Sequence, residues 1–165
     1  MSEKPHFVGS ENHEVVANYL VKELQNLRIQ PSFQEGYTMT EKGTLVKSKN
    51  IIATIKGTVP SNKALLLLSH YDSAPHSYSH GASDDASGVA TILESVRAFL
   101  HANTKHKNDY CIAHFSDDLS DLQYCRDTSD FCTFCCDTEI TEMFLTDRQS
   151  CYSKVCNALP IPKKD

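Results

Sequence analysis

The first 110 residues contain no cysteine, although the whole chain of 165 residues has seven. An odd number of cysteines without a secretory signal argues against a disulfide framework, so we expect the thiols to be free. The same point of the chain marks a change of composition, because the last third is rich in Cys, Asp, Thr and Ser and has weak periodicity. Because strong periodicity and turn punctuation are both lacking there, we expect Leu119 to Asp165 to fold poorly.

Long apolar runs and an excess of basic residues are also missing. No run approaches the length needed to span a bilayer, and the start, MSEKPHFVGS, has no hydrophobic signal region. The sequence as written therefore predicts a cytoplasmic product without a membrane segment, although a fragment of a longer secreted or membrane-bound parent would look the same. Because the chain has a net charge of -5, we do not expect it to bind nucleic acid or anionic membrane surfaces.

The short apolar run from Ala64 to Leu68 predicts a strand covered on both faces, as in a parallel sheet. Polar residues follow where this strand ends, which is where open α/β sheets place their ligands. On extended backbone His70 and Asp72 project to the same side, so the carboxylate can orient the imidazole. The following loop carries His76 and His80, which we interpret as rim residues that contact either substrate or solvent.

An amphipathic helix is predicted from about Ala86 to His101, because apolar residues recur there at helical spacing. Asp84 and Asp85 precede it, at a position where the helix dipole and free amides favour a charged carboxylate. A carboxylate facing a neutral imidazole is a set of metal ligands. The alternative remains open, because a lone His after a strand is usually a surface residue and an Asp before a helix is usually only a cap.

The two segments His70-Tyr71-Asp72-Ser73 and Gly81 to Ala90, GASDDASGVA, resemble the zinc-binding core of the M28 family of metallopeptidases. The resemblance implies an α/β fold, with a mixed β-sheet flanked by helices as in zinc exopeptidases. It implies that His70 binds one zinc, that Asp84 bridges two zincs, and that Asp72 is the catalytic-site carboxylate that supports His70. It also implies a cis peptide between Asp84 and Asp85, and hydrolysis of short peptides that have a free N-terminus.

The sequence also predicts a helix near the N-terminus. A first helix is capped by Ser10 or Asn12, and its face carries Val16, Tyr19, Leu20, Leu24 and Leu27. The wording PHFVGSENH resembles the stretch ahead of this helix in membrane-associated M28 relatives, and we interpret His6 as structural. Arg28 stands where many relatives have Gly, at a cost of about 1 kcal/mol if the backbone is left-handed there.

Extended segments are predicted at Phe33 to Thr40, Leu45 to Thr58 and Tyr110 to Phe115. The clearest strand is Asn50 to Gly57. The resemblance implies that this strand and the strand at Ala64 to Leu68 are neighbours in one mixed sheet.

The sequence departs from the family's pattern after Phe115. Relatives have a motif close to FSDAEELG, in which the first Glu is the general base and the second Glu is a zinc ligand. Leu119 and Ser120 occupy these places here, and no histidine follows His114. Neither Leu nor Ser can take a proton from a metal-bound water, and the ligand set is incomplete, so we expect little or no activity.

We therefore divide the chain into an M28-like α/β domain, residues 1–116, and a Cys-rich segment of unknown or poor order, residues 117–165. Cys132, Cys135, Cys151 and Cys156 form a candidate four-sulfur zinc site whose second pair has unsuitable spacing. One hypothesis for the change of composition is a truncated or frame-shifted product, out of frame from near Asp109. The alternative to an enzyme is a non-catalytic binding or dimerisation module of the same fold.

Overall fold

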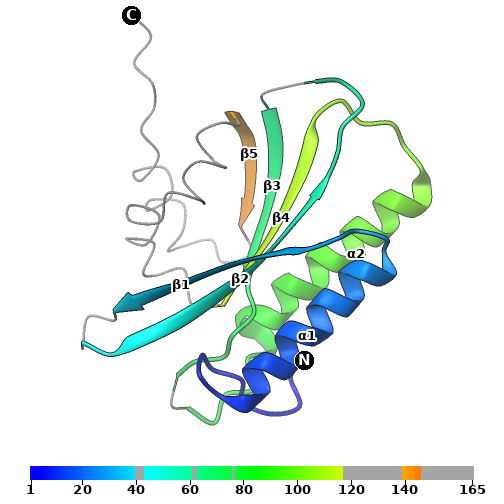
Figure 1. The fold of residues 1–165 in the computed structure, drawn as a ribbon. Coiled ribbons are helices and arrows are strands. Elements are labelled where there is room, and N and C mark those ends of the chain that lie inside the picture. Colours follow the sequence, from blue (N-terminus) through cyan, green and yellow to red (C-terminus); the bar gives the residue numbers. More distant parts are fainter. Residues whose placement is uncertain (40–42, 61–62, 76, 117–138, 146–165) are drawn as a thin grey trace, which may run out of the picture.

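The computed structural model describes residues 1–39, 43–60, 63–75, 77–116 and 139–145 (Figure 1). Two long helices, one short irregular helical turn and five strands form this part of the chain. Their bounds, in chain order, are α1 (Glu11–Asn26), β1 (Ser32–Met39), β2 (Leu45–Ile55), β3 (Lys63–His70), η1 (Ala82–Ala86), α2 (Ser87–Ala102), β4 (Asp109–Phe115) and β5 (Glu139–Leu145).

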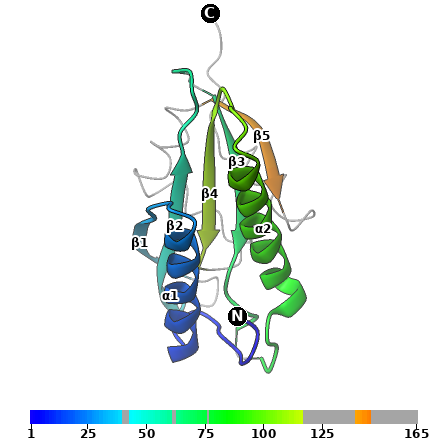
Figure 2. The same ribbon diagram turned by 90° about the vertical axis from the view of Figure 1, so that its right-hand side faces the viewer.

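The five strands form one mixed sheet in the order β1-β2-β4-β3-β5. The pairs β1/β2 and β2/β4 are antiparallel, whereas β3 is parallel to both β4 and β5. Figures 1 and 2 show α1 and α2 side by side against the same face of this sheet. The predicted mixed sheet flanked by helices is therefore confirmed.

The neighbour relation expected for β2 and β3 is wrong, because β4 lies between them. His114 of β4 pairs with Ile51 of β2 on one side and with Ser69 of β3 on the other. The physical reason is the connection from β3 through α2 to β4, a strand-helix-strand unit that returns the chain as a parallel neighbour of its first strand. β4 thus takes the place that the resemblance implied for β2.

Strand β5 lies within the segment that is expected to fold poorly. It pairs with β3 from Lys63 to Leu68 and lies at an edge of the described sheet. The division of the chain at residue 116 stays a prediction, and the candidate four-sulfur site lies outside the described residues. Within them, Cys111 is a free and buried thiol.

Helix α1 begins and ends as its sequence predicts. The Ser10 side chain accepts a hydrogen bond from the His13 N–H at 3.2 Å, which satisfies a free amide of the first turn. After Asn26 the chain turns through Arg28 at φ 62°, the left-handed conformation that glycine adopts most easily. The expected strain at Arg28 is therefore present in the structure.

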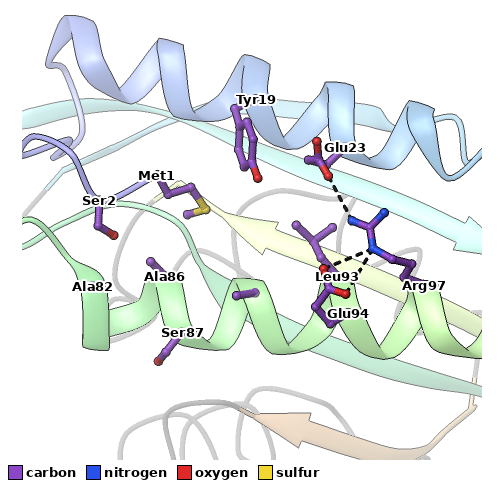
Figure 3. Close-up of a pocket in the computed structure, with 11 residues that line it drawn as sticks. Met1, Ser2, Tyr19, Glu23, Ala82, Ala86, Ser87, Leu93, Glu94 and Arg97 are labelled. Carbon is purple, nitrogen blue, oxygen red and sulfur yellow. Dashed lines mark hydrogen bonds and ion pairs between the residues drawn. The ribbon is translucent and has the colours of Figure 1, made fainter.

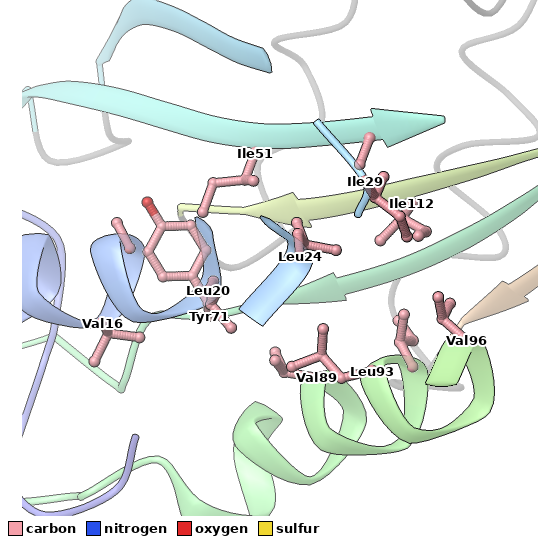
Figure 4. Close-up of a cluster of buried hydrophobic side chains, with 13 residues drawn as sticks. Val16, Leu20, Leu24, Ile29, Ile51, Tyr71, Val89, Leu93, Val96 and Ile112 are labelled. Carbon is pink, nitrogen blue, oxygen red and sulfur yellow. The ribbon is translucent and has the colours of Figure 1, made fainter. Parts of the chain in front are cut away.

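The core lies between the sheet and the two helices, as Figure 4 shows. The two helices contribute residues at three- and four-residue spacing, β2 contributes the alternate residues Ile51 and Ala53, and β4 contributes Ile112. Tyr71, just after β3, belongs to this core and has no exposed surface. The buried cluster consists of Val16, Ala17, Leu20, Leu24, Ile29, Ile51, Ala53, Tyr71, Val89, Ile92, Leu93, Val96 and Ile112.

Candidate metal site

His70 is the last residue of β3, so it lies where the carboxyl end of this strand reaches the boundary of the sheet. The Tyr71 N–H still donates to the Phe115 carbonyl of β4 at 2.9 Å, which keeps the backbone extended beyond His70. As the two-residue spacing predicts, His70 and Asp72 share a side, and His70 Nδ1 donates to Asp72 Oδ1 at 2.9 Å. The two side chains are only 6% and 4% exposed, so the carboxylate holds the imidazole from behind in a nearly dry environment.

Asp84 reaches the imidazole from the opposite side. It lies in η1, where Asp84 and Asp85 have non-helical backbone angles and the peptide between them is cis, as the resemblance implies. This backbone aims the Asp84 carboxylate at His70, with Oδ1 at 3.1 Å from His70 Nε2. The Asp84 side chain is 74% exposed, so solutes can reach this side of the imidazole.

Asp85, in contrast to Asp84, is buried. Its Oδ1 accepts a hydrogen bond from the Gly88 N–H at 3.1 Å, in the first turn of α2. This is the contact of a helix cap, so the two adjacent carboxylates have different surroundings. Asp85 supports the helix, whereas Asp84 faces the imidazole.

The charge of His70 is set by these acidic neighbours. Burial alone would lower the pKa of His70, but the hydrogen bond to Asp72 and the negative charges of Asp72, Asp85 and Asp84 together raise it to about 9. The imidazole is therefore protonated at neutral pH when no metal is bound, and both of its nitrogens donate to carboxylates. A metal ion at Nε2 has to displace this proton.

Of the two loop histidines, the structure describes His80, which does not join this cluster. His80 is exposed, and its Nδ1 lies 3.3 Å from the Ser2 carbonyl. His76 lies outside the described residues, as do Leu119 and Ser120. A role for His76 or His80 in substrate contact stays a prediction.

The residues present fit part of a zinc site. Two ligands of a tetrahedral zinc, each about 2.0 to 2.2 Å from the metal, lie about 3.3 to 3.6 Å apart. The 3.1 Å between His70 Nε2 and Asp84 Oδ1 is slightly shorter than this range. An imidazole whose second nitrogen is bound to a carboxylate is the usual arrangement of a zinc-ligating histidine. Among the described residues, however, no group of three or more His, Cys, Asp or Glu side chains is placed to hold a metal ion.

A buried polar layer lies beneath the site, and no local pattern in the sequence predicts it. His13 of α1 stacks on Tyr71 at 4.7 Å between ring centroids, and its Nε2 lies 3.1 Å from the Ser116 carbonyl. The Ser116 hydroxyl accepts from the Lys49 N–H at 2.7 Å, and the Ser116 N–H donates to Asn50 Oδ1 at 3.1 Å. The chain leaving β4 is therefore tied to α1 and β2 beside the candidate site.

His114 is part of the same layer and is completely buried. Its Nδ1 lies 2.6 Å from Ser69 Oγ, while Nε2 has no hydrogen-bond partner among the described residues. Burial lowers the pKa of His114 to about 4, so this imidazole is neutral at pH 7. Two histidines of neighbouring strands, His70 and His114, thus have opposite protonation states in the metal-free protein.

A separate hollow of about 400 Å³ lies between α1 and α2. Figure 3 shows Arg97 spanning it, with ion pairs to Glu23 and to Glu94 at 3.2 Å each. Neither His70 nor Asp84 lines this hollow. It is therefore not the space beside the candidate ligands.

Comparison with known proteins supports the class that fold and site define, an α/β domain of the zinc-exopeptidase type. A Zn-dependent exopeptidase from Parabacteroides distasonis superposes with a TM-score of 0.56 at 25% identity, over 67% of this chain and 40% of that protein. A glutaminyl cyclase from Porphyromonas gingivalis superposes with a TM-score of 0.67 at 23% identity, over 86% of this chain and 52% of that protein. The second likeness concerns the fold alone.

The sequence match concerns the middle of the chain. Residues 50–117 match the model of peptidase family M28, so this part of the chain is a fragment of that family. A vacuolar membrane protease of Candida albicans is 32% identical over 99 residues, which are 59% of this chain and 12% of that protein. The chain thus spans a small part of this relative. Among the described residues, neither helix is long and apolar enough to cross a membrane.

Proposed function

We propose that the site is the front half of a zinc-dependent peptidase site that acts on peptides with a free N-terminus. One observation carries the proposal: His70 Nε2 and Asp84 Oδ1 lie 3.1 Å apart at the edge of the sheet, with Asp72 bound to the other nitrogen of the imidazole. The family match, which includes all three residues, supports peptide-bond hydrolysis as the reaction.

Each of the three side chains has a distinct role in this proposal. His70 would hold zinc through Nε2, which must first lose its proton. Asp72 keeps the proton on Nδ1 and fixes the orientation of the ring. Asp84 supplies a charged oxygen on the exposed side, where in the family's pattern it bridges two zincs. Zinc would supply polarisation of the peptide carbonyl and a bound water of lowered pKa.

Turnover by this chain is expected to be weak or absent. The family's two glutamates are replaced by Leu119 and Ser120, so the proton of the attacking water lacks its usual acceptor. The Candida albicans relative is named a vacuolar membrane protease, and that name places it at the vacuolar membrane. We extend that location to this chain only as part of the proposal, for a longer parent protein.

The test combines metal analysis of the purified chain with turnover of an aminoacyl chromogenic substrate. We expect zinc to bind in the wild-type chain and to be lost in His70→Ala, with little turnover in either. Two zincs with substantial turnover would establish an active enzyme. A well-folded protein without zinc would favour the binding or dimerisation module, and unfolding without cooperativity would favour the truncated product.

A further inference from the structure

We propose that His6 is a positioning residue of the candidate metal site, which fixes the spacing between the segment carrying His70 and Asp72 and the segment carrying Asp84. The inference rests on the proposed function, because it concerns the same site. His6 lies ahead of α1 and far from the site in sequence, yet it is only 1% exposed. Its contacts reach both segments.

The first contact joins His6 to the chain just after Asp72. The His6 N–H donates to Ser73 Oγ at 2.8 Å, and the Ser73 N–H donates back to the His6 carbonyl at 3.4 Å. Ser73 has no exposed surface, so these bonds are shielded from water. The backbone of His6 therefore restrains the direction in which the chain leaves Asp72.

The second contact joins the His6 ring to the turn that carries Asp84. His6 Nδ1 lies 3.0 Å from the Lys4 carbonyl, which can only accept, so Nδ1 carries the proton and the ring is held in one orientation. Gly81 has φ +61°, and a Cβ placed on it would lie 3.2 Å from His6 Cε1, 3.1 Å from Ser73 Cβ and 3.2 Å from the Asp84 carbonyl oxygen. The four residues are thus packed with no room for an added methyl group.

These contacts place His6 between the two halves of the site. Asp84 itself is largely exposed, so the position of its carboxylate depends on the backbone of the turn rather than on surrounding side chains. Within the turn, the Ala86 N–H donates to the Gly81 carbonyl at 3.0 Å, and the His6 ring lies where a side chain on Gly81 would point. Without the ring, Gly81 gains space and the Asp84 carboxylate loses its fixed distance from His70.

The experiment compares three variants of the full chain: His6→Ala, His6→Asn and Leu24→Ala. His6→Asn keeps a donor for the Lys4 carbonyl but withdraws atoms from Gly81. Leu24→Ala is the control, because Leu24 is fully buried in α1 and belongs to the hydrophobic core. Zinc affinity is measured by competition with a chelator, and amide hydrogen exchange of Ser73 and Ala86 is measured without metal.

We expect His6→Ala to weaken zinc binding by roughly 10-fold or more, as for other outer-shell partners of metal ligands. His6→Asn should lose less, and Leu24→Ala should destabilise the fold without changing zinc affinity. If His6→Ala fails to fold, the zinc affinity of His6→Asn is compared with that of Leu24→Ala instead. Equal zinc affinities in the His6 variants and the control would overturn the proposal.

Hydrogen exchange separates this inference from the proposed function. If the wild-type chain binds no zinc, the proposed function fails, and the exchange of the two amides decides whether His6 positions the segments. Positioning predicts that Ser73 and Ala86 lose protection in His6→Ala relative to amides of the central strands. A loss that matches the one in Leu24→Ala would show a role in stability alone.

Discussion

The two halves of the candidate site differ in their exposure to water. The pair at the end of β3, His70 and Asp72, is 6% and 4% exposed, whereas the Asp84 side chain in η1 is 74% exposed. The first half is held by the sheet and by the buried layer beneath it. The second half is a charged group on a turn, open to solvent and to ions.

This difference separates stability from binding. A buried ion pair contributes little when intact but is costly to break, because the remaining charge has neither water nor a partner. An exposed carboxylate 3.1 Å from an imidazole is well solvated and contributes little to folding. We therefore expect the buried half to control the stability of the metal-free protein, and both halves to control metal affinity.

The largest expected effect comes from removing the imidazole. His70→Ala leaves the Asp72 carboxylate buried without its partner, so the free energy of unfolding should fall by about 3 to 5 kcal/mol. Asp84→Ala should lower it by less than about 1 kcal/mol. Urea unfolding of the metal-free variants at pH 7 measures both values.

The matched control for this prediction is the double variant His70→Ala/Asp72→Asn. Removing the second charge should recover part of the loss, because a neutral amide costs less to bury than a carboxylate. If His70→Ala and Asp84→Ala destabilise the protein equally, the division into a structural half and an exposed half is wrong.

The next effect is a dependence of stability on pH that comes from His70. Its folded pKa of about 9 lies above the unfolded value of 6.5, so the stabilisation is complete below pH 6.5 and is lost as the pH rises to 9. The size is about 3 kcal/mol. Unfolding of the metal-free chain between pH 6.5 and 9 should show this loss, and His70→Ala should lack it.

His114 gives the opposite dependence. Its folded pKa of about 4 lies below 6.5, so the unfolded state takes up a proton first, and stability is lost as the pH falls from 6.5 to 4. This loss is also about 3 kcal/mol. His114→Gln should flatten the acid side of the stability profile and leave the alkaline side intact. A profile with no alkaline loss would show that Asp72 and Asp84 do not hold the His70 proton.

The helix positions and the convergence of His70 with Asp84 were predictable from the sequence, because each depends on local signals. The apolar run before His70 marks the strand, and the apolar periodicity after Asp85 marks the helix. The placement of β4 between β2 and β3 was not predictable, because strand order is decided by contacts between residues distant in sequence. For the same reason nothing local showed that His6 and His114 would be buried.

A smaller effect distinguishes the two adjacent carboxylates. Asp85→Ala removes the acceptor for the Gly88 N–H at the start of α2, which should cost about 1 to 2 kcal/mol, as for other helix caps. Asp85→Asn keeps an acceptor and should recover most of this loss. Thermal unfolding of both variants beside Asp84→Ala measures the contrast, and equal losses at positions 84 and 85 would contradict it.

The smallest effect is expected at an exposed ion pair away from the site. Lys56 Nζ lies 2.7 Å from Asp109 Oδ2, but the Lys56 side chain is 80% exposed. Lys56→Met should therefore change the free energy of unfolding by less than about 1 kcal/mol, and less still in high salt. If Lys56→Met lowered the free energy of unfolding as much as His70→Ala does, and independently of salt, exposure to water would not explain the contrast between the two halves.

The most direct test is a zinc titration of four proteins: the wild-type chain, His70→Ala, Asp84→Asn and the double variant. If imidazole and carboxylate bind the same ion, each single variant should lose most of the zinc affinity, and the double variant should lose little more. Zinc binding that survives both substitutions, or losses that simply add, would show that these two side chains do not share a metal ion.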